Sequence, residues 1–363
     1  MKVCYFGAYD HNYPRNQIIR QGLILNDVQV IECNVSQEIR TWQKYPPLFR
    51  EYLKYCQGCD CIVVAEFGQS LVPLAWLLSK FARKPLVFDA FTSLYDSAVS
   101  DREIVKAKSI RALRYYFLDR VALSLADAIL VDTKQHAEHF ISWFSVKPSK
   151  ISVIPVGVSD DWFYPRPSSG REDSYLLIQF YGTFIPLHGV QYIVKAAKIL
   201  EEKYADVRIE LIGKGQTFED AYALAQQLRL RNLSFVEPVP PTELPLLIAR
   251  VDICLGIFGD TGKAHRVIPN KVYQSLAMRK PVITGDSPAI REVFRDGEHL
   301  LLCRMADPES LAEAILQLKN SEALRERIAF NGYALVKSQF TPEGIGKRLK
   351  GVLEELLEKQ HNR

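Results

Sequence analysis

Residues 266–286 read Arg266-Val-Ile-Pro-Asn-Lys-Val-Tyr-Gln-Ser-Leu-Ala-Met-Arg-Lys-Pro-Val-Ile-Thr-Gly-Asp286. The pattern predicts a polar loop, a helix opened by Pro269 and a buried strand, because proline suits the first turn of a helix. The backbone N–H groups of a first turn lack partners within the helix, and together with the helix dipole they attract anions. Lys271 and Gln274 share one face of this helix, while Val272 and Leu276 lie on another and can seat it in a core.

This segment therefore combines an anion site, a cation beside it and an amide one turn further on. That arrangement suits a sugar nucleotide, with the diphosphate at Pro269-Asn270-Lys271 and the ribose hydroxyls on Gln274. An ordinary strand–helix–strand unit with a solvated polar face accounts for the same residues, so the segment alone leaves both interpretations open.

Length and composition predict a globular protein of two domains. The chain has 363 residues, of which 48% are hydrophobic and 24% charged, and its net charge is +4. That mild charge does not indicate a nucleic-acid partner. No apolar run approaches the roughly 20 residues that span a bilayer, and the N-terminus enters a strand pattern without a signal peptide. We therefore expect a cytoplasmic chain.

The seven cysteines favour a structural over a metal-binding interpretation. Cys4, Cys61 and Cys254 lie in apolar strand runs and are expected to be buried thiols. Cys56, Cys59 and Cys61 are close enough for metal or redox chemistry, but no second Cys/His pair at zinc-finger spacing follows.

Short apolar runs alternate with helical segments along the chain, which predicts an α/β fold of parallel sheets. The expected strands are residues 2–9, 28–33, 61–67, 85–91, 128–132, 151–156, 176–181, 207–212, 233–236, 253–257, 281–284 and 300–303. Two prolines and small polar residues at 162–171 predict a linker between the sixth and seventh strands. The loops after the strands should carry the chemistry, because ligands of open parallel sheets bind at the carboxyl ends.

Polar residues crowd two strand ends of the first half, after the first and the fourth strand. The first loop supplies Gly7, Tyr9, Arg15 and Asn16, and it lacks the G-x-G-x-x-G pattern of dinucleotide sites. Asp89 ends the fourth strand, where an unpaired carboxylate would be costly. Asp89 should therefore meet a cation, for which Arg102 is a candidate, cap a loop or contact a substrate.

The second half offers three such loops. Gly182 and His188 follow the seventh strand, and Gly213 and Lys214 follow the eighth. A glycine-rich, basic loop with Lys263 and Arg266 then leads into the helix after Pro269, which carries Lys271. Together these three cations can neutralise a diphosphate. A mobile surface loop with solvated charges is the alternative.

Four segments together resemble glycosyltransferase family 4, whose GT-B architecture has two facing Rossmann-like domains. They are Val153-Ile-Pro-Val-Gly-Val-Ser-Asp-Asp-Trp-Phe-Tyr-Pro165, Tyr181-Gly-Thr-Phe-Ile-Pro-Leu-His-Gly189, Leu211-Ile-Gly-Lys-Gly215 and Ala277-Met-Arg-Lys-Pro-Val-Ile-Thr-Gly-Asp286. The resemblance implies an acceptor-binding domain at 1–165, a sugar-nucleotide-binding domain at 171–340, and a helix at 341–363 that packs back on the first.

It further implies transfer of a sugar, with retention of anomeric configuration and no obligatory metal or other cofactor, from a UDP-, GDP- or ADP-sugar to a carbohydrate or lipid-linked acceptor. The family pattern has two glutamates eight positions apart, and here those positions are Arg266 and Gln274. A common cationic pair is replaced by Thr183 and His188, and a histidine after the fourth strand by Phe91. We expect Arg266 and Lys271 to stabilise the leaving phosphate and Asp89 to orient the acceptor hydroxyl.

Two other activities stay open at this stage: a sugar-nucleotide epimerase of the same fold and a non-catalytic sugar-nucleotide-binding protein. Peripheral membrane contact is a further alternative, because residues 41–55 and 106–116 mix basic and aromatic side chains. Helices packed on a sheet give a similar pattern.

Overall fold

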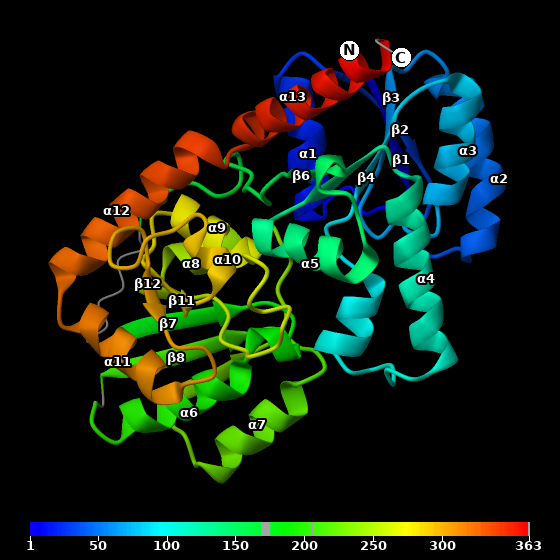
Figure 1. The fold of residues 1–363 in the computed structure, drawn as a ribbon. Helices are drawn as coiled ribbons and strands as arrows, with labels where there is room; N and C mark the ends of the chain where they lie inside the picture. The colour runs from blue at the N-terminus through cyan, green and yellow to red at the C-terminus, as the bar shows by residue number, and fades with distance from the viewer. Residues whose placement is uncertain (168–174, 205, 362–363) are drawn as a thin grey trace. The chain divides into compact units, whose positions relative to one another are not determined.

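The computed structural model describes residues 1–167, 175–204 and 206–361 (Figure 1). The chain divides into two compact units. Unit 1 comprises Met1–Gly157 with Phe340–Arg363, and unit 2 comprises Val158–Gln339. The boundary thus falls at Gly157, whereas the sequence places it at residue 165. Part of the predicted linker, residues 168–171, lies outside the described residues.

Unit 1 is built on a six-stranded sheet in the order β2-β1-β3-β4-β5-β6, in which every pairing is parallel. Its strands are β1 Lys2–Gly7, β2 Gln29–Asn34, β3 Cys61–Val64, β4 Leu86–Asp89, β5 Ala128–Val131 and β6 Ile151–Val153. The three strands β3, β4 and β5 are buried throughout, as parallel strands covered on both faces should be.

Helices cover both faces of this sheet. The right-handed crossover rule places α1 on one face and the connections from β2 onward on the other. Side chains of the latter share a single core cluster. The helices of unit 1 are α1 Pro14–Leu25, α2 Thr41–Glu51 with a π-helical turn Tyr52–Cys56, α3 Val72–Ala82, the π-helical turn Asp96–Asp101, α4 Ile110–Leu125, α5 Lys134–Phe144 and α13 Pro342–His361.

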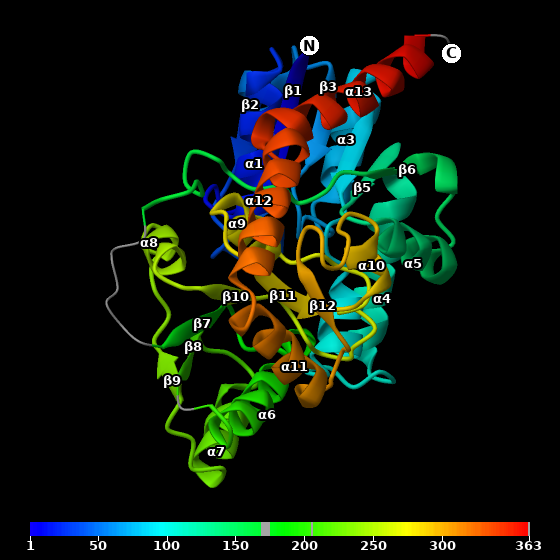
Figure 2. The same cartoon turned by 90° about the vertical axis from the view of Figure 1, so that its left-hand side faces the viewer.

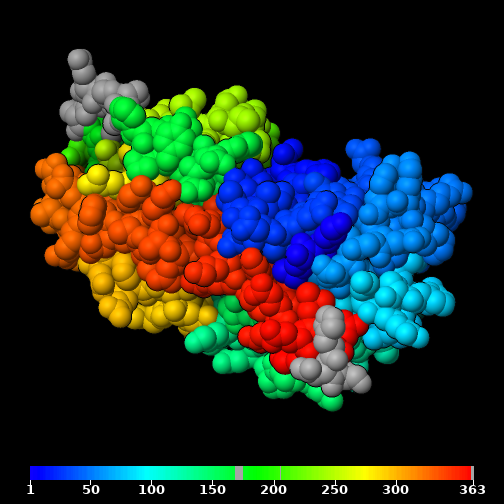
Figure 3. All heavy atoms as spheres, turned by 90° about the horizontal axis from the view of Figure 1, so that it is seen from above, coloured from blue at the N-terminus to red at the C-terminus, as the bar shows by residue number. Residues whose placement is uncertain are grey.

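The last helix, α13, packs against α1, as Figures 2 and 3 show. Ile345, Leu349 and Leu353 are fully buried along its inner side. The two helices approach closely at a pair of glycines: a Cβ on Gly22 would lie 2.9 Å from the Cα of Gly346. The N-terminal and C-terminal segments of the chain are thereby joined in one unit.

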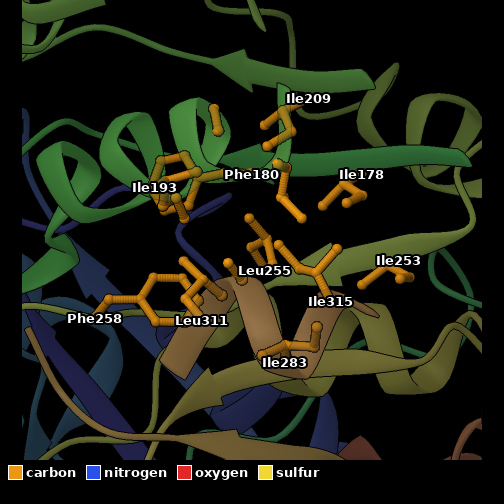
Figure 4. Close-up of a cluster of buried hydrophobic side chains, with 14 of the residues drawn as sticks. Ile178, Phe180, Ile193, Ile209, Ile253, Leu255, Phe258, Ile283, Leu311 and Ile315 are labelled. Atoms are coloured by element: carbon orange, nitrogen blue, oxygen red, sulfur yellow. The ribbon is translucent and has the colours of Figure 1, made fainter. Parts of the chain in front are cut away.

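Unit 2 repeats the plan with a parallel sheet in the order β12-β11-β10-β7-β8-β9. Its strands are β7 Leu176–Tyr181, β8 Val207–Ile212, β9 Leu233–Val236, β10 Ile253–Leu255, β11 Val282–Gly285 and β12 Leu301–Cys303. Its helices are α6 Val190–Glu201, α7 Phe218–Gln227, α8 Leu244–Ala249, α9 Asn270–Ala277, α10 Pro288–Arg291, α11 Pro308–Lys319 and α12 Glu322–Gln339. Aliphatic and aromatic side chains of the sheet meet α6 and α11 in the core shown in Figure 4.

The α/β prediction is confirmed, and each predicted strand has a counterpart in the described residues. Strands β7, β8 and β9 have the predicted bounds, whereas the strand predicted at 85–91 ends at Asp89 and that at 61–67 ends at Val64. All seven cysteines are buried and none forms a disulfide. Within the described residues, no helix is both long and apolar enough to cross a membrane.

Candidate functional site

The sheet of unit 2 has its topological switch point between β7 and β10. From β7 the chain continues to β8 on one side, whereas β10, β11 and β12 lie on the other. Ligands of open parallel sheets bind beside such a point, at the carboxyl ends of the strands. The loops there are residues 182–189 and 256–269, and α9 follows the second. Most of the residues predicted to bind a donor lie in these segments.

Glycine at 182 keeps space open at this edge. Gly182 has φ 140° and Gly213 has φ 132°, a region that side-chain-bearing residues rarely adopt. A Cβ on Gly182 would lie 3.1 Å from Nζ of Lys271, and a Cβ on Gly213 would collide with the carbonyl oxygen of Gly182. The two strand ends can therefore approach each other and the lysine only without side chains.

Lys271 is a buried cation at the start of α9. Its side chain is 5% exposed, and its Nζ lies 3.9 Å from the ring centroid of Phe180. In the part of the chain that the structure describes, Nζ has no hydrogen-bond partner. Burial therefore lowers the pKa of this ammonium well below its ordinary value. The contact with the aromatic ring offsets part of the desolvation cost, and an anion would offset the rest.

The structure corrects two details of the helix prediction. Pro269 is the N-cap, with φ −73° and ψ 151°, and the helix begins at Asn270. Residues 271–277 are all buried, so α9 has no solvated polar face. The reason is tertiary: α9 packs on β10 and β11 and also against α12, a contact that helical periodicity does not reveal.

Gln274 is held by the last residue of β7. The hydroxyl of Tyr181 donates to Oε1 of Gln274 at 3.2 Å and also lies 3.2 Å from the carbonyl oxygen of Lys271. This contact fixes the amide so that its NH₂ group remains as a donor. Gln274 is 8% exposed, so its position is set by packing as well as by this hydrogen bond.

His188 is oriented by the backbone of its own loop. Its Nδ1 lies within hydrogen-bond distance of the carbonyl oxygen of Thr183, which can only accept, so Nδ1 carries the proton. Nε2 is then the atom that the neutral ring offers as an acceptor. The ring packs edge-on against Phe180, the same side chain that lies beneath Lys271.

The other predicted cations differ in their surroundings. Lys263 and Arg266 are half-buried in the loop before α9, where the Arg266 N–H donates to the Lys263 carbonyl oxygen at 3.0 Å. Lys214 forms an exposed ion pair with Glu237, at 2.8 Å, which reduces the charge it can offer to a phosphate. Lys271, rather than Lys214, is therefore the buried and unpartnered lysine beside Gly182.

In unit 1, the predicted partner of Asp89 is wrong. Its carboxylate pairs with Arg15, at 2.8 Å between Nη2 and Oδ1 and 3.0 Å between Nε and Oδ2, and both side chains are fully buried. Arg15 also donates to the carbonyl oxygens of Ile154 and Pro155. Arg102 is exposed. Arg15 lies in α1, which follows β1, and β1 lies two strands from β4 in the sheet, so this proximity depends on strand order.

The remaining predicted acceptor residues lie at the carboxyl end of β1. The hydroxyl of Tyr9 donates to Glu32 at 2.6 Å, so this buried side chain points toward β2. Asn16 accepts from Tyr5 and donates to Glu66. A Cβ on Gly7 would lie 3.3 Å from the Cβ of Ala65, at the switch point between β1 and β3.

Sequence reasoning missed two buried polar groups in this region. Burial raises the pKa of Glu66 to about 9, and its Oε2 has no hydrogen-bond partner in the described ranges. Asp132 holds Nδ1 of His136 at 2.7 Å. Each acid lies at the end of an expected apolar strand, the same signal that identified Asp89, and Tyr181 lies at such an end in unit 2.

No group of three or more His, Cys, Asp or Glu within residues 1–167, 175–204 and 206–361 is arranged to hold a metal ion.

Residues 165–335 match the family model "Glycosyl transferases group 1". This region contains the whole sheet of unit 2 together with the Lys271 site. The curated relatives include D-inositol 3-phosphate glycosyltransferase of Corynebacterium glutamicum, 22% identical over 70% of this chain and 63% of its own length. The capsular polysaccharide biosynthesis glycosyltransferase CapM of Staphylococcus aureus is 21% identical over 71% and 70%. The lipopolysaccharide core biosynthesis glycosyltransferase LpsE of Rhizobium meliloti is 27% identical over 45% of each chain.

The chain thus spans between 45% and 70% of the length of these relatives. Among solved structures, sucrose-phosphate synthase of Thermosynechococcus elongatus has a TM-score of 0.74 at 15% identity, over 99% of this chain and 100% of its own. HepE of Anabaena, in complex with UDP and glucose, has a TM-score of 0.74 at 16% identity, over 98% and 100%. These likenesses concern the fold, which is GT-B, and the relatives support an enzyme of the glycosyltransferase class.

Proposed function

We propose that this protein is a retaining glycosyltransferase that moves a sugar from a nucleoside-diphosphate donor to a hydroxyl of a carbohydrate or lipid-linked acceptor. Donor binding falls to unit 2 and acceptor binding to unit 1. The donor is a UDP-, GDP- or ADP-sugar, and no metal is obligatory. The reaction takes place in the cytoplasm, at the inner face of the membrane where the acceptor is a lipid. The resemblance to family 4 supports retention, and the structural likeness to HepE, solved in complex with UDP-glucose, supports a nucleotide-sugar donor.

The observation that carries the proposal is the unsatisfied ammonium of Lys271. A buried charge without a hydrogen-bond partner is costly, and Lys271 lies at the switch point where parallel sheets bind ligands. It is also in the first turn of α9, whose backbone N–H groups attract anions. A diphosphate would satisfy the cation and the free N–H groups together.

The remaining donor roles follow from this position. The diphosphate would lie at Asn270 and Lys271 with Pro269 as the cap, and Arg266 and Lys263 on the preceding loop would add charge. The amide of Gln274, oriented by Tyr181, would donate to ribose hydroxyls. The sugar would be bordered by the residues that follow β7 and β8, namely Gly182, Thr183, Gly213 and Lys214. Nε2 of His188 would also lie beside it.

In such a transfer the anomeric carbon becomes positively charged as the nucleoside diphosphate leaves. The contribution of the protein is to hold the two substrates and to stabilise the negative charge that develops on the departing phosphate. Lys271 and Arg266 would do this on the donor side. Both oxygens of Asp89 are engaged by Arg15, so Asp89 would position the acceptor through that ion pair and the strand end it anchors.

The acceptor side would use the loop after β1, with Gly7, Tyr9 and Asn16, together with Arg102 after β4. The protonated carboxyl of Glu66 lies among these residues and can donate to a hydroxyl oxygen, because its raised pKa keeps it neutral. This arrangement would bind a neutral sugar hydroxyl without adding a second negative charge near Asp89.

The test is thermal stabilisation by a panel of UDP-, GDP- and ADP-sugars, followed by detection of the transferred product. A bound donor raises the melting temperature because it binds only the native state. One nucleotide class should stabilise the protein, and Lys271→Met should lose that stabilisation while Lys195→Met, an exposed lysine of α6, should keep it. Isomerisation of the donor without transfer to any acceptor would refute the proposal, as would a panel without any stabilising nucleotide.

A further inference from the structure

One helix of unit 1, α4, exposes an apolar stripe to solvent. Ile110 is 88% exposed, and Leu113, Phe117 and Val121 are between 42% and 55% exposed. Spacings of three and four residues place these four side chains, here called the α4 stripe, on one face of the helix. Contiguous exposed apolar surface of this kind marks an interaction site more often than scattered single residues do.

The stripe is not needed for the packing of α4. The opposite face holds the helix in place, with Ala112, Ala122 and Leu123 fully or almost fully buried. The buried carboxylate of Asp119 accepts hydrogen bonds from the Ser93 hydroxyl and from two backbone N–H groups in the segment after β4. The helix therefore has a complete inner face, and the outer face is available.

Basic side chains border the stripe and are not neutralised. On α4, Arg111 and Arg120 flank the stripe on opposite sides and Arg114 lies beside it, and Lys106 and Lys108 are exposed just before the helix. Within the described residues none of these five forms an ion pair; Arg111 and Arg120 contact tyrosine hydroxyls. The acid of this helix, Asp119, is on the buried face. The outward face is thus apolar and purely cationic.

The neighbouring helices α2 and α3 also expose apolar side chains beside cations. Helices α2, α3 and α4 contribute to one core cluster and so cover the same face of the sheet, with α3 packed beside α4 (Figure 1). Helix α2 exposes Trp42 and Phe49, and α3 exposes Leu77 and Phe81. Exposed cations accompany these side chains at Arg40, Arg50, Lys54 and Arg83.

We propose that the α4 stripe and its cations dock this protein on a bilayer that contains anionic lipids. Apolar side chains would enter the interface between headgroups and acyl chains while the flanking arginines contact lipid phosphates. The charge selects this occupant: a second copy of the chain would bring cations against cations, whereas an anionic surface complements them.

The location of the stripe connects docking to the acceptor, and this link rests on the proposed function. Helix α4 follows β4, so its first residues lie toward the carboxyl end of the sheet, the edge that carries Asp89 and Glu66. Docking through Ile110 would bring that edge close to the headgroups. A hydroxyl carried by a membrane lipid would then be presented to unit 1 without leaving the bilayer.

Co-sedimentation of the full chain with vesicles tests the proposal. The protein should pellet with equimolar phosphatidylcholine and phosphatidylglycerol but much less with phosphatidylcholine alone. Replacing Arg111, Arg114 and Arg120 by Gln should weaken partitioning by about a hundredfold, at about fivefold for each charge near an anionic surface. Ile110→Ser with Phe117→Ser should weaken it by about tenfold or more.

Matched controls lie in unit 2: Leu246→Ser for the apolar change, and Gln in place of Lys195, Lys203 and Arg229 for the charge change. Equal pelleting with both vesicles, no pelleting, or equal effects of control and test variants would overturn the proposal. So would concentration-dependent dimerisation that the α4 variants abolish. Nucleotide-induced thermal stabilisation of the same samples separates the two ideas, because it reports the donor site of unit 2 and not the docking face.

Discussion

Replacing Lys271 by methionine should make the protein more stable and a poorer nucleotide binder at the same time. Methionine matches the length and the apolar stem of lysine, so it fills the space beside Phe180 and Gly182 without the charge. Opposite signs for stability and binding are expected because the ammonium is buried without a hydrogen-bond partner among the described residues.

The gain in stability is the desolvation cost of the ammonium minus its cation–π attraction to Phe180, which methionine cannot make. Burying an unpartnered polar group costs about 1–3 kcal/mol in proteins, and the attraction to Phe180 returns about 1 kcal/mol. A net gain of about 1 kcal/mol corresponds to a rise in melting temperature of about 2–4 °C for a domain of this size. The pKa of Lys271 is lowered, so the native state binds its proton less tightly than the unfolded chain does. The stabilising effect of Lys271→Met should therefore disappear above the ordinary lysine pKa and grow as the pH falls below it.

The decrease in binding is that expected for removing one charge-assisted hydrogen bond to phosphate. Such hydrogen bonds contribute about 1.5–3 kcal/mol, so Kd for the donor nucleotide should rise about 10- to 150-fold. A diphosphate also raises the lowered pKa of Lys271, because it stabilises the protonated form. Binding to the wild type should thus take up protons, at a pH where the free ammonium is partly deprotonated, and binding to Lys271→Met should not.

Calorimetric titration in buffers of different ionisation enthalpy measures both the affinity and the proton uptake, and thermal unfolding of the apo proteins measures the stability. Lys195→Met serves as the control, because that side chain is exposed on α6. An unchanged Kd for the nucleotide would refute a role of Lys271 in binding it. A melting temperature several degrees below that of the wild type would contradict the expected gain in stability, since it would show that the ammonium stabilises the fold.

Three further substitutions separate packing from binding. Gly182→Ala should cost about 1–3 kcal/mol of stability in thermal unfolding, because alanine is strained at φ 140°. It should also weaken nucleotide binding in a calorimetric titration, since its Cβ would lie 3.1 Å from Nζ of Lys271. Asp89→Asn should lower the free energy of unfolding by about 3–5 kcal/mol in urea, because it leaves the Arg15 charge buried; a decrease below about 1 kcal/mol would contradict a structural ion pair. Glu66→Gln should stabilise the protein more at pH 8 than at pH 5. Because the pKa of Glu66 is raised to about 9, the wild type loses stability as the pH rises from the ordinary carboxyl pKa toward 9, and glutamine removes that dependence. Parallel pH profiles of stability for the two proteins would contradict this prediction.

The sequence was sufficient for the strands and for the places where chemistry gathers. Parallel strands buried on both faces give continuous apolar runs, which is why β7, β8 and β9 have the predicted bounds. Polar residues directly after such runs, among them Asp89 and Gly182, lie at the carboxyl ends as expected. The predicted strand at 85–91 is two residues too long at its end, because Ala90 and Phe91 are apolar although β4 ends at Asp89.

Pairings between distant residues could not be predicted, because they depend on strand order and on which helix covers which. Arg102 is close to Asp89 in the sequence, but Arg15 reaches it because α1 follows β1, which lies two strands from β4 in the sheet. Helical spacing likewise left open a solvated polar face for the helix after Pro269, whereas α12 and the sheet enclose α9. Local periodicity describes one element, and burial is decided by its neighbours.

The two units bury their cations in opposite ways, and the contrast separates structure from function. The guanidinium of Arg15 engages a carboxylate and two backbone carbonyl oxygens, so its burial is compensated within the fold and it anchors α1 to β4. The Nζ of Lys271 lies over the aromatic ring of Phe180 and has no hydrogen-bond acceptor among the described residues. The unpartnered side chain of Lys271 therefore lowers stability at the edge of unit 2 that Gly182 keeps open. An anionic ligand at the same edge would supply the missing acceptor, and this is why the unpaired cation, rather than the paired one, points to the site of chemistry.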